Sequence, residues 1–223
     1  AQWMVHGQTE INVRGMDPRR FGDHTGAKGQ FAYDKAIEEY HLMYATRPPG
    51  ENHPAARKQK TTPIYDRLDA LGAQWHEVYG WERPQYFGEP EQHSFLRSNA
   101  FAIVGEEVRG VRERVGVADL TAFAKFEVTG TDAAALLDRV SANKIPGKIG
   151  GMRLVHMLTE LGGIECEMTI TRLAENRYYL NSAIMGTTHD QDWLNQHIAD
   201  GEDVTVADIT DAHGIIAVTG PRA

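Results

Sequence analysis

IECEMTITRL, residues 164–173, is the stretch from which the fold of this sequence can be predicted. In a β-strand, side chains two residues apart point to the same face, so this stretch would present one apolar and one polar face. The apolar face would carry Ile164, Cys166, Met168 and Ile170, and the polar face Glu165, Glu167, Thr169 and Thr171. We therefore expect a strand with one side in a hydrophobic core.

Alternating strand and helix patterns surround this strand. Expected strands cover residues 123–128, 153–160, 177–183, 204–209 and 215–218, and expected helices cover residues 131–140 and 188–199. Thr131 would be the N-cap of the first of these helices. Gly162 and Gly163 separate two of the alternating runs, where they predict a hairpin turn. This order predicts an α+β fold, with a ferredoxin-like antiparallel sheet and helices on one face.

The chain before residue 123 has a different character. A helix is expected over residues 31–44, but the apolar residues there are too few for an independent core. Residues 48–60, PPGENHPAARKQK, are interpreted as an exposed connection because they combine prolines with a polar run. We place a domain boundary there, which gives a first domain of residues 1–57 and a second domain of residues 58–223.

Two helices are expected at the start of the second domain. The first would cover residues 61–80, because Thr62 can serve as N-cap and Pro63 suits the first helical position. The second would begin near Ser98. Its apolar stripe would consist of Phe101, Val104, Val108 and Val111.

The composition argues against several classes of function. The sequence is 41% hydrophobic and 24% charged, as in soluble globular enzymes, and its net charge of −8 would repel a nucleic-acid backbone. Cys166 is the single cysteine, so an internal disulfide is impossible and a reducing compartment is expected. No apolar stretch approaches the roughly 20 residues that span a bilayer. We therefore expect neither nucleic acid nor a membrane as a partner.

The polar face of residues 164–173 has two interpretations at this point. Solvated strand faces are common, so a row of carboxylates does not by itself identify a site. The ten histidines are scattered without metal-ligand spacing and Cys166 is expected in the core, so no metal site is predicted. No Gly-x-Gly-x-x-Gly follows a predicted strand, so these residues should not bind a dinucleotide by themselves.

Several longer motifs resemble one enzyme family. DPRRFG at residues 17–22, TPIYDRLDALGA at residues 62–73 and GWERPQYF at residues 80–87 resemble the region that joins the two halves of dimethylglycine dehydrogenase, sarcosine dehydrogenase and dimethylglycine oxidase. Residues 112–140, with GGIECEMTITRL and YYLNSA, look like the first part of their folate-binding half. That half is similar to the T-protein aminomethyltransferase of the glycine cleavage system. The resemblance runs from Met16 to the last residue.

The resemblance implies a reaction. In that family a flavin half oxidises an N-methyl amine, such as dimethylglycine or sarcosine, to an iminium. The folate half then lets tetrahydrofolate capture the one-carbon unit as 5,10-methylenetetrahydrofolate. The polar face of residues 164–173 would be a wall of the folate site, where a carboxylate manages a proton and stabilises developing positive charge.

The resemblance also implies site residues. Glu167 matches the family's catalytic Asp beside folate N10, Thr169 matches a nearby Thr, and Asn181 matches the pterin-side Asn. Tyr179 shares the face of Asn181 by the period of two, so it is expected to contact folate as well. We therefore predict Glu167 as catalytic and the other three residues as folate-binding.

The sequence departs from the family at two of these positions. Glu167 has one more methylene than Asp, which moves the carboxylate by about 1 Å, and such a shift can cost about a hundredfold in rate. Leu154 stands where T-proteins have a folate-contacting Tyr. Two alternatives therefore stay open, a noncatalytic scaffold with a folate fold and a stand-alone T-protein-like aminomethyltransferase. DPRRFG and GWERPQYF argue against the second.

Cofactors, partners and location follow from the same resemblance. Tetrahydrofolate and a methylated amine are the expected small molecules, and FAD is expected in the N-terminal half of a parent protein. The remaining folate residues of the family would follow Ala223, so the sequence is expected to be part of a longer chain or to work with a flavin subunit. A homo-oligomer in the bacterial cytoplasm or the mitochondrial matrix is expected.

Overall fold

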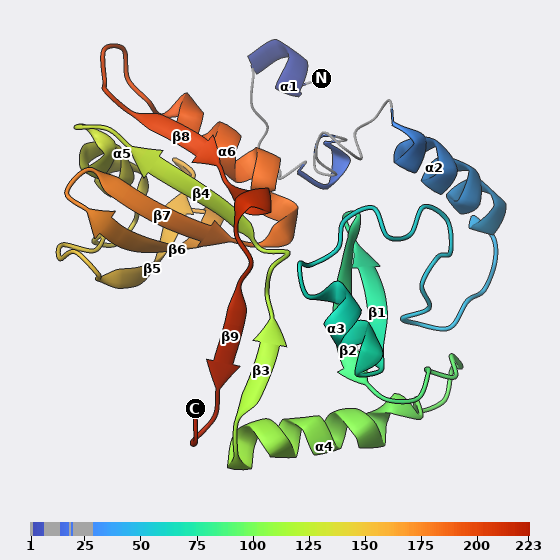
Figure 1. The fold of residues 1–223 in the computed structure, drawn as a ribbon. Helices are drawn as coiled ribbons and strands as arrows, with labels where there is room; N and C mark the ends of the chain where they lie inside the picture. The colour runs from blue at the N-terminus through green and yellow to red at the C-terminus, as the bar shows by residue number, and fades with distance from the viewer. Residues whose placement is uncertain (1, 7–13, 18, 20–28) are drawn as a thin grey trace. The chain divides into compact units, whose positions relative to one another are not determined.

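The computed structural model describes residues 2–6, 14–17, 19 and 29–223. The chain divides into two compact units (Figure 1). The first, which we call the sheet unit, comprises residues 1–27 and 124–210. The second, the hairpin unit, comprises residues 28–123 and 211–223.

A five-stranded antiparallel sheet forms the centre of the sheet unit. After residue 123, the sheet unit contains β4 (Ala124–Thr129), α5 (Ala133–Val140), β5 (Met152–Leu158), β6 (Ile164–Ala174), β7 (Arg177–Ser182), η4 (Ile184–Gly186), α6 (Thr187–Gln196) and β8 (Thr205–Asp208). The short helix η5 (Thr210–Ala212) lies at the boundary between the two units. The strand order is β5-β6-β7-β4-β8, in which β6-β7-β4-β8 has the ferredoxin-like order and β5 adds an edge strand. The predicted α+β fold is confirmed.

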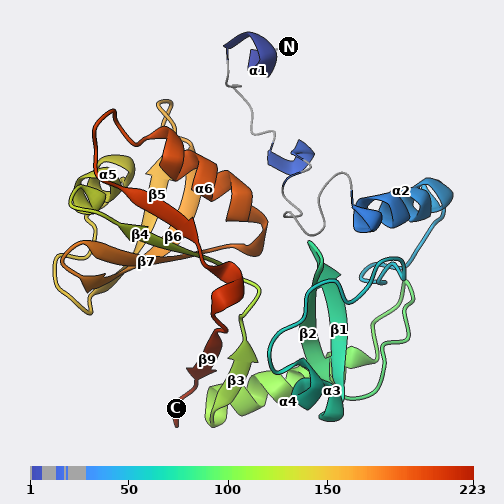
Figure 2. The same ribbon diagram turned by 45° about the horizontal axis from the view of Figure 1, so that its top comes forward.

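Helices α5 and α6 pack on one face of this sheet (Figure 2). Leu136 and Leu137 of α5 and Leu194 of α6 are fully buried against the apolar side chains of the strands. Met168 and Ile170 of β6 belong to the same core, at 1% and 0% exposure. The other face of β6 is thereby left to the polar side chains, as the alternation predicted.

A tight turn connects β4 to α5. Gly130 has a φ of 124°, and a Cβ atom there would lie 1.9 Å from the backbone oxygen of Asp203. Asp132, and not the predicted Thr131, is the N-cap of α5. Thr131 instead donates hydrogen bonds from its backbone N and its Oγ1 to the Asp203 carboxylate, at 2.9 and 3.0 Å. The turn therefore depends on its glycine and on the loop before β8.

The first and last strands of the sheet unit meet at their outer ends. The backbone N of Ile209 donates to the Lys125 oxygen at 2.9 Å, and the Lys125 N donates to Thr210 Oγ1 at 3.1 Å. The Lys125 side chain is fully buried, and its Nζ donates to the Thr210 backbone oxygen at 2.9 Å. The points where the chain enters and leaves the sheet are therefore bonded to each other.

Before β4, the described residues of the sheet unit form α1 (Gln2–His6), η1 (Arg14–Met16) and part of the DPRRFG motif. Arg19 pairs with Asp17 at 2.7 Å and with Asp192 of α6 at 2.8 Å. Thr188 Oγ1 also donates to the Arg19 backbone oxygen at 3.0 Å. Arg19 is thereby attached to α6, and the rest of the motif lies outside the described residues.

The hairpin unit contains two separate pairs of strands. Its elements are α2 (Gln30–Leu42), α3 (Tyr65–Ala70), β1 (Ala73–Val78), β2 (Trp81–Phe87), α4 (Ala100–Glu113), β3 (Gly116–Asp119) and β9 (Ile216–Thr219). β1 pairs with β2, and β3 pairs with β9, both antiparallel. None of the helices in the described part of the chain is long and apolar enough to cross a membrane.

The helix predicted for residues 61–80 is wrong at both ends, and Ile64, not the predicted Thr62, is its N-cap. Only α3 is helical, because Gly72 adopts a φ of 85° and the chain then continues as strand β1. Tyr79 and Gly80, with φ values of 52° and 83°, form the turn into β2, as both central residues of a type I′ turn require. Tyr65 of α3 stacks on Trp75 of β1 at 4.2 Å between ring centroids. The apolar residues that suggested one helix therefore belong partly to α3 and partly to β1.

The connection expected over residues 48–60 is not a free linker. Asn52 donates to the Trp75 backbone oxygen at 2.6 Å, which ties the segment to β1. Arg57 donates two hydrogen bonds to the buried Glu82 of β2, at 2.7 and 2.5 Å. Ala56 and Lys58, on either side of Arg57, both have positive φ values, of 50° and 61°. These contacts hold the segment against the hairpin.

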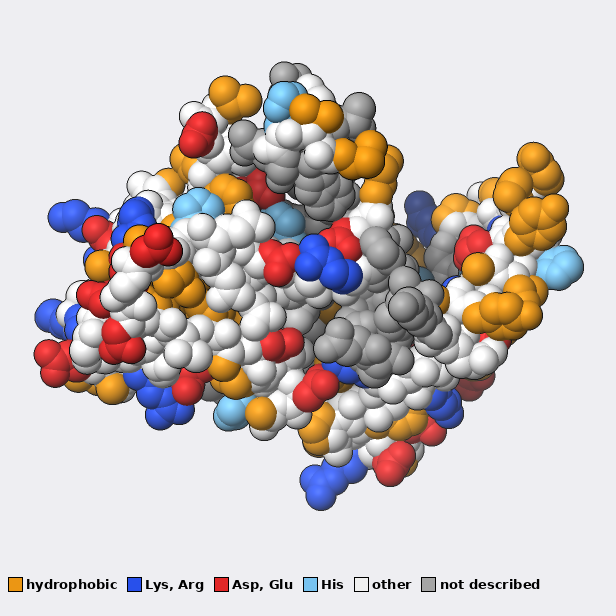
Figure 3. Space-filling view, turned by 90° about the horizontal axis from the view of Figure 1, so that it is seen from above, with side chains coloured by type: hydrophobic (Ala, Val, Ile, Leu, Met, Phe, Trp, Pro, Cys, Tyr) orange, Lys and Arg blue, Asp and Glu red, His pale blue; other side chains and the backbone are white. Residues whose placement is uncertain are grey.

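The predicted helices α2 and α4 form, but the apolar stripe of α4 is largely exposed. Phe101, Val104 and Val108 of α4 are 62%, 38% and 48% exposed. Hydrophobic side chains also gather over α2, where Tyr33 and Tyr40 are 63% and 74% exposed (Figure 3). The stripe predicted for α4 is therefore not buried in a core of the described residues.

Candidate functional site

Antiparallel pairing brings the predicted site residues together on one face of the sheet. Thr169 of β6 lies directly opposite Asn181 of β7, and Thr171 lies opposite Tyr179. Residues directly opposite each other in such a sheet point to the same side. Glu167 is on that side of β6 as well, two residues before Thr169. We call this surface the open face of the sheet.

Three of these residues are partly buried and well held. Asn181 Nδ2 donates to the Ala124 backbone oxygen at 3.2 Å. Burial raises the pKa of the Tyr179 hydroxyl, and a hydrogen bond with the Asn181 amide offsets part of that rise. Thr169 is half-buried between them and β5. The Tyr179 hydroxyl is therefore a neutral hydrogen-bonding group near pH 7.

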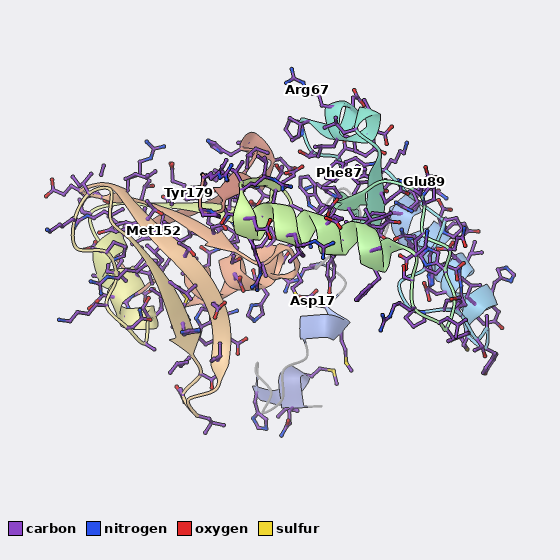
Figure 4. All side chains as sticks on the ribbon, turned by 90° about the horizontal axis from the view of Figure 1, so that it is seen from below. Asp17, Arg67, Phe87, Glu89, Met152 and Tyr179 are labelled. Atoms are coloured by element: carbon purple, nitrogen blue, oxygen red, sulfur yellow. The ribbon has the colours of Figure 1, made fainter. Side chains whose placement is uncertain are left out.

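The open face also carries apolar side chains next to the polar ones. Leu154 of β5 lies opposite Thr169, and Met152 lies opposite Thr171. They are 54% and 65% exposed. Met152 and Tyr179 stand on the two strands that flank β6 (Figure 4). The face thus offers apolar contact beside hydroxyl, amide and carboxylate groups, which suits a flat heteroaromatic molecule with polar edges.

A β-bulge changes the polar row at the start of β6. Met157 pairs with Cys166 but Leu158 pairs with Ile164, so Glu165 is the extra residue of the bulge. Ile164, predicted to face the core, is 63% exposed as a result. Glu165 leaves the predicted row, because its carboxylate lies 2.5 Å from His189 Nε2 of α6. The alternation predicted from the sequence therefore holds only from Cys166 onward.

His189 gathers several titratable groups at this end of the strand. Its Nδ1 lies 2.9 Å from the Asp190 carboxylate and 3.9 Å from the Cys166 sulfur. Ligand atoms of these three residues lie within 4.8 Å of one another, as do those of Glu38, Glu39 and His53 in the hairpin unit. The contact between His189 and Glu165 attaches α6 to β6, whereas His189 and Asp190 are neighbours within α6. The expectation of no metal site stays a prediction.

His156, which no sequence pattern indicated as a site residue, also lies on the open face. His156 Nε2 lies 2.6 Å from Glu167 Oε2. The two side chains are 38% and 58% exposed. The Leu158–Ile164 register, continued without a bulge, would set His156 opposite Cys166. The bulge at Glu165 shifts the register by one residue and sets it opposite Glu167.

Two family models match this chain, and their matches meet between residues 62 and 64. The family model of the GCVT N-terminal domain matches residues 64–223. The family model of the FAD dependent oxidoreductase central domain matches residues 6–62. GWERPQYF lies inside the first match, so it no longer argues against a stand-alone aminomethyltransferase, whereas DPRRFG lies inside the second.

The curated relatives that match over the whole chain include two proteins named as mitochondrial. Human mitochondrial dimethylglycine dehydrogenase is 34% identical over 100% of this chain. The mouse mitochondrial pyruvate dehydrogenase phosphatase regulatory subunit is 33% identical, also over 100%. The chain spans only 26% of the length of each of these relatives.

A solved structure supports the assignment of the fold. The glycine cleavage system aminomethyltransferase T from Bartonella henselae is 25% identical, with a TM-score of 0.60. The match covers 73% of this chain and 41% of that protein. With residues 64–223 matched by one family model and the fold shared with an aminomethyltransferase, this chain belongs to the GCVT N-terminal domain family and carries a segment of the FAD dependent oxidoreductase central domain ahead of it.

Proposed function

We propose that this chain is the folate-side part of a flavin-dependent demethylating dehydrogenase or oxidase acting on N-methyl amines such as dimethylglycine or sarcosine. The observation that carries the proposal is the open face, where Glu167, Thr169, Tyr179 and Asn181 lie on neighbouring strands. Identity of 34% to dimethylglycine dehydrogenase supports it. The matched segment of an FAD dependent oxidoreductase favours this reading over a stand-alone aminomethyltransferase.

Each residue of the open face would have a defined task. Tetrahydrofolate, when bound, supplies the two nitrogens that take up the one-carbon unit. Asn181 and Tyr179 would hold the polar edge of the pterin, and Leu154 and Met152 would cover its flat surface. Glu167 would accept the proton released at N10 and stabilise positive charge on the reacting carbon. Exclusion of water matters, because water reaching the iminium would release free formaldehyde.

Further parts of the proposal concern the parent protein. FAD would bind in a part of that protein other than residues 1–223, supplied by the same chain or by a flavin subunit. The boundary between the flavin and folate halves would lie near residue 57, which is supported by the two family matches meeting at residues 62 and 64. A homo-oligomer, in the bacterial cytoplasm or the mitochondrial matrix, is proposed. The relatives with mitochondrial names support the second location.

A noncatalytic scaffold is the second candidate function. It is favoured by the 33% identity to a protein named as a phosphatase regulatory subunit. In that case Glu167 would be an ordinary solvated carboxylate, and the sheet would serve to hold other subunits.

Product partition in the full-length protein separates the two candidates. Glu167→Gln should leave amine oxidation nearly unchanged, but should lower the yield of 5,10-methylenetetrahydrofolate and raise free formaldehyde. The measurement is the ratio of the two products at saturating amine and folate. Glu175→Gln, which changes an exposed carboxylate in the β6–β7 turn, is the matched control. An unchanged ratio in Glu167→Gln would favour the scaffold.

Two simpler measurements bear on the same proposal. The full-length protein should show a flavin absorbance spectrum, and flavin should be released on denaturation. The 223-residue chain should bind tetrahydrofolate weakly or not at all in calorimetry, because the family completes the site with residues from its second half. Tight one-to-one binding by this chain would show that the site is misplaced.

A further inference from the structure

We infer that His156 is a positioning residue, which fixes the carboxylate of Glu167 on the open face through the hydrogen bond between them. The inference rests on the proposed function. It adds a residue that would hold the longer side chain of Glu167 in the position that the proposed reaction requires. The carboxylate would thus be presented by a histidine–glutamate pair and not by a carboxylate alone.

The backbone of His156 is held on the side away from Glu167. The Ala142 backbone N donates to the His156 oxygen at 2.8 Å, and the His156 N donates to Asn143 Oδ1 at 3.3 Å. Asn143 Nδ2 also donates to the Leu154 oxygen at 3.0 Å. Edge strand β5 is therefore braced by the segment after α5. The imidazole extends from a fixed backbone toward its partner.

Glutamate needs such a partner more than a shorter carboxylate would. Its extra methylene adds a rotatable bond, so the carboxylate of an exposed Glu samples several positions. Glu167 is 58% exposed, and only His156 holds its side chain among the hydrogen bonds of the described residues. A displacement of about 1 Å at a reacting group is costly in rate. The contact at 2.6 Å selects one position for the carboxylate.

Because the His156–Glu167 pair is exposed, a role in positioning the carboxylate can be distinguished from a role in stabilising the fold. Exposed ion pairs contribute little to the stability of a fold. Replacement of His156 should therefore leave the melting temperature nearly unchanged. Its effect should appear in the fate of the one-carbon unit.

The pair itself is tested first, without folate. Ring ¹⁵N chemical shifts of His156 in this chain report which nitrogen carries the proton. They should show a hydrogen-bonded Nε2 in the wild type and a changed ring signature in Glu167→Gln. Identical ring shifts in the two proteins would overturn the inference, whatever the fate of the proposed function.

A double-mutant cycle in the full-length protein then tests the role. His156→Leu should raise the ratio of formaldehyde to 5,10-methylenetetrahydrofolate by about tenfold, a size typical for loss of a residue that orients a functional group. His156→Gln should restore most of the capture, because an amide can donate to the carboxylate. In a Glu167→Asp background, His156→Leu should change the ratio little, since the shorter side chain does not reach the imidazole. His53→Leu, which removes the exposed His53–Glu39 pair of the hairpin unit, is the control.

The two claims fail in different ways. If Glu167→Gln changes the product ratio but His156→Leu does not, the positioning role is overturned and the proposed function stands. An equal effect of His156→Leu in the wild-type and Glu167→Asp backgrounds would also overturn it, because the effect would then not pass through the pair. If Glu167→Gln leaves the ratio unchanged, the proposed function itself fails.

Discussion

At the scale of single residues, Glu82 is a buried charged residue of the hairpin unit. Its side chain is 0% exposed and accepts two hydrogen bonds from Arg57 and one from the Lys58 backbone N at 2.8 Å. Arg57 is itself 25% exposed. The partners are therefore unequal, because only the carboxylate lies wholly away from water.

This asymmetry predicts different costs for the two halves of the pair. Arg57→Met should destabilise the chain by about 3–5 kcal/mol, since it leaves a buried carboxylate unpaired. Glu82→Gln should cost less, about 1–3 kcal/mol, because the amide keeps an acceptor and Arg57 can reach water. Urea unfolding followed by tryptophan fluorescence measures both. An equal or reversed order would show that Glu82 is hydrated in solution.

The same carboxylate predicts the direction of a pH effect. Burial alone would raise the pKa of Glu82, but hydrogen bonds and charge from Arg57 and Lys58 lower it overall. A lowered pKa in the folded state means that Glu82 stabilises the fold fully above the unfolded carboxyl pKa of about 4.3. This stabilisation is lost as the pH falls through the lower, folded pKa. Unfolding curves between pH 7 and 3 should therefore show a smaller loss of stability in Glu82→Gln than in the wild type.

At the scale of elements, the turn between β4 and α5 depends on one glycine. Gly130 combines a φ of 124° with a backbone oxygen 1.9 Å from the position of a Cβ atom. Gly130→Ala should cost at least about 3 kcal/mol, from strain and from displacement of the loop before β8. Gly162→Ala in the β5–β6 turn is the control, since Gly162 has a φ of 80° and no atom within 4 Å of its Cβ position. It should cost only about 1–2 kcal/mol. Similar melting temperatures for the two variants would contradict this account.

The elements also show where prediction from the sequence succeeds. The strands and helices of residues 124–208 could largely be predicted from alternation or helical spacing, because each has one face in a shared core. The β1–β2 hairpin could not be predicted in the same way. Its apolar residues also fit a helix, and Tyr79 is an unusual residue for the positive φ that its turn requires.

Part of the candidate site could be predicted from the sequence, and part could not. Thr169, Tyr179 and Asn181 could be placed on one face because alternation in β6 and β7 is regular there. The His156–Glu167 pair could not, because it depends on a bulge. A bulge shifts the register by one residue without any signal as strong as a glycine or proline.

At the scale of the whole molecule, the two units differ in the size of their cores. In the part of the sheet unit that the structure describes, sixteen buried apolar residues form one cluster. Among the described residues of the hairpin unit six apolar side chains are buried, namely Phe31, Ala73, Trp81, Tyr86, Ala100 and Ala122. Slow exchange of amide hydrogens requires buried apolar contacts around the hydrogen bonds.

Hydrogen exchange should therefore separate the units. Amides of β4, β6 and β7 should exchange at the slowest rates, through global unfolding, while those of β1 and β2 should exchange faster through local opening. Mass spectrometry of peptides from each strand measures this. Equal protection of both units would mean that the hairpin unit has a larger stabilising contribution than its buried side chains indicate.

The bonds between Lys125, Ile209 and Thr210 give the sheet unit the topology of an insertion. Residues 124–210 leave and rejoin the rest of the chain at adjacent points. Domains whose ends lie together tolerate circular permutation and transplantation into other loops. A short linker could join the two ends while the chain is reopened at the turn around Gly162, and every strand pair of the sheet would be kept. Residues 124–210, with the open face intact, could thus be grafted into another protein as one unit.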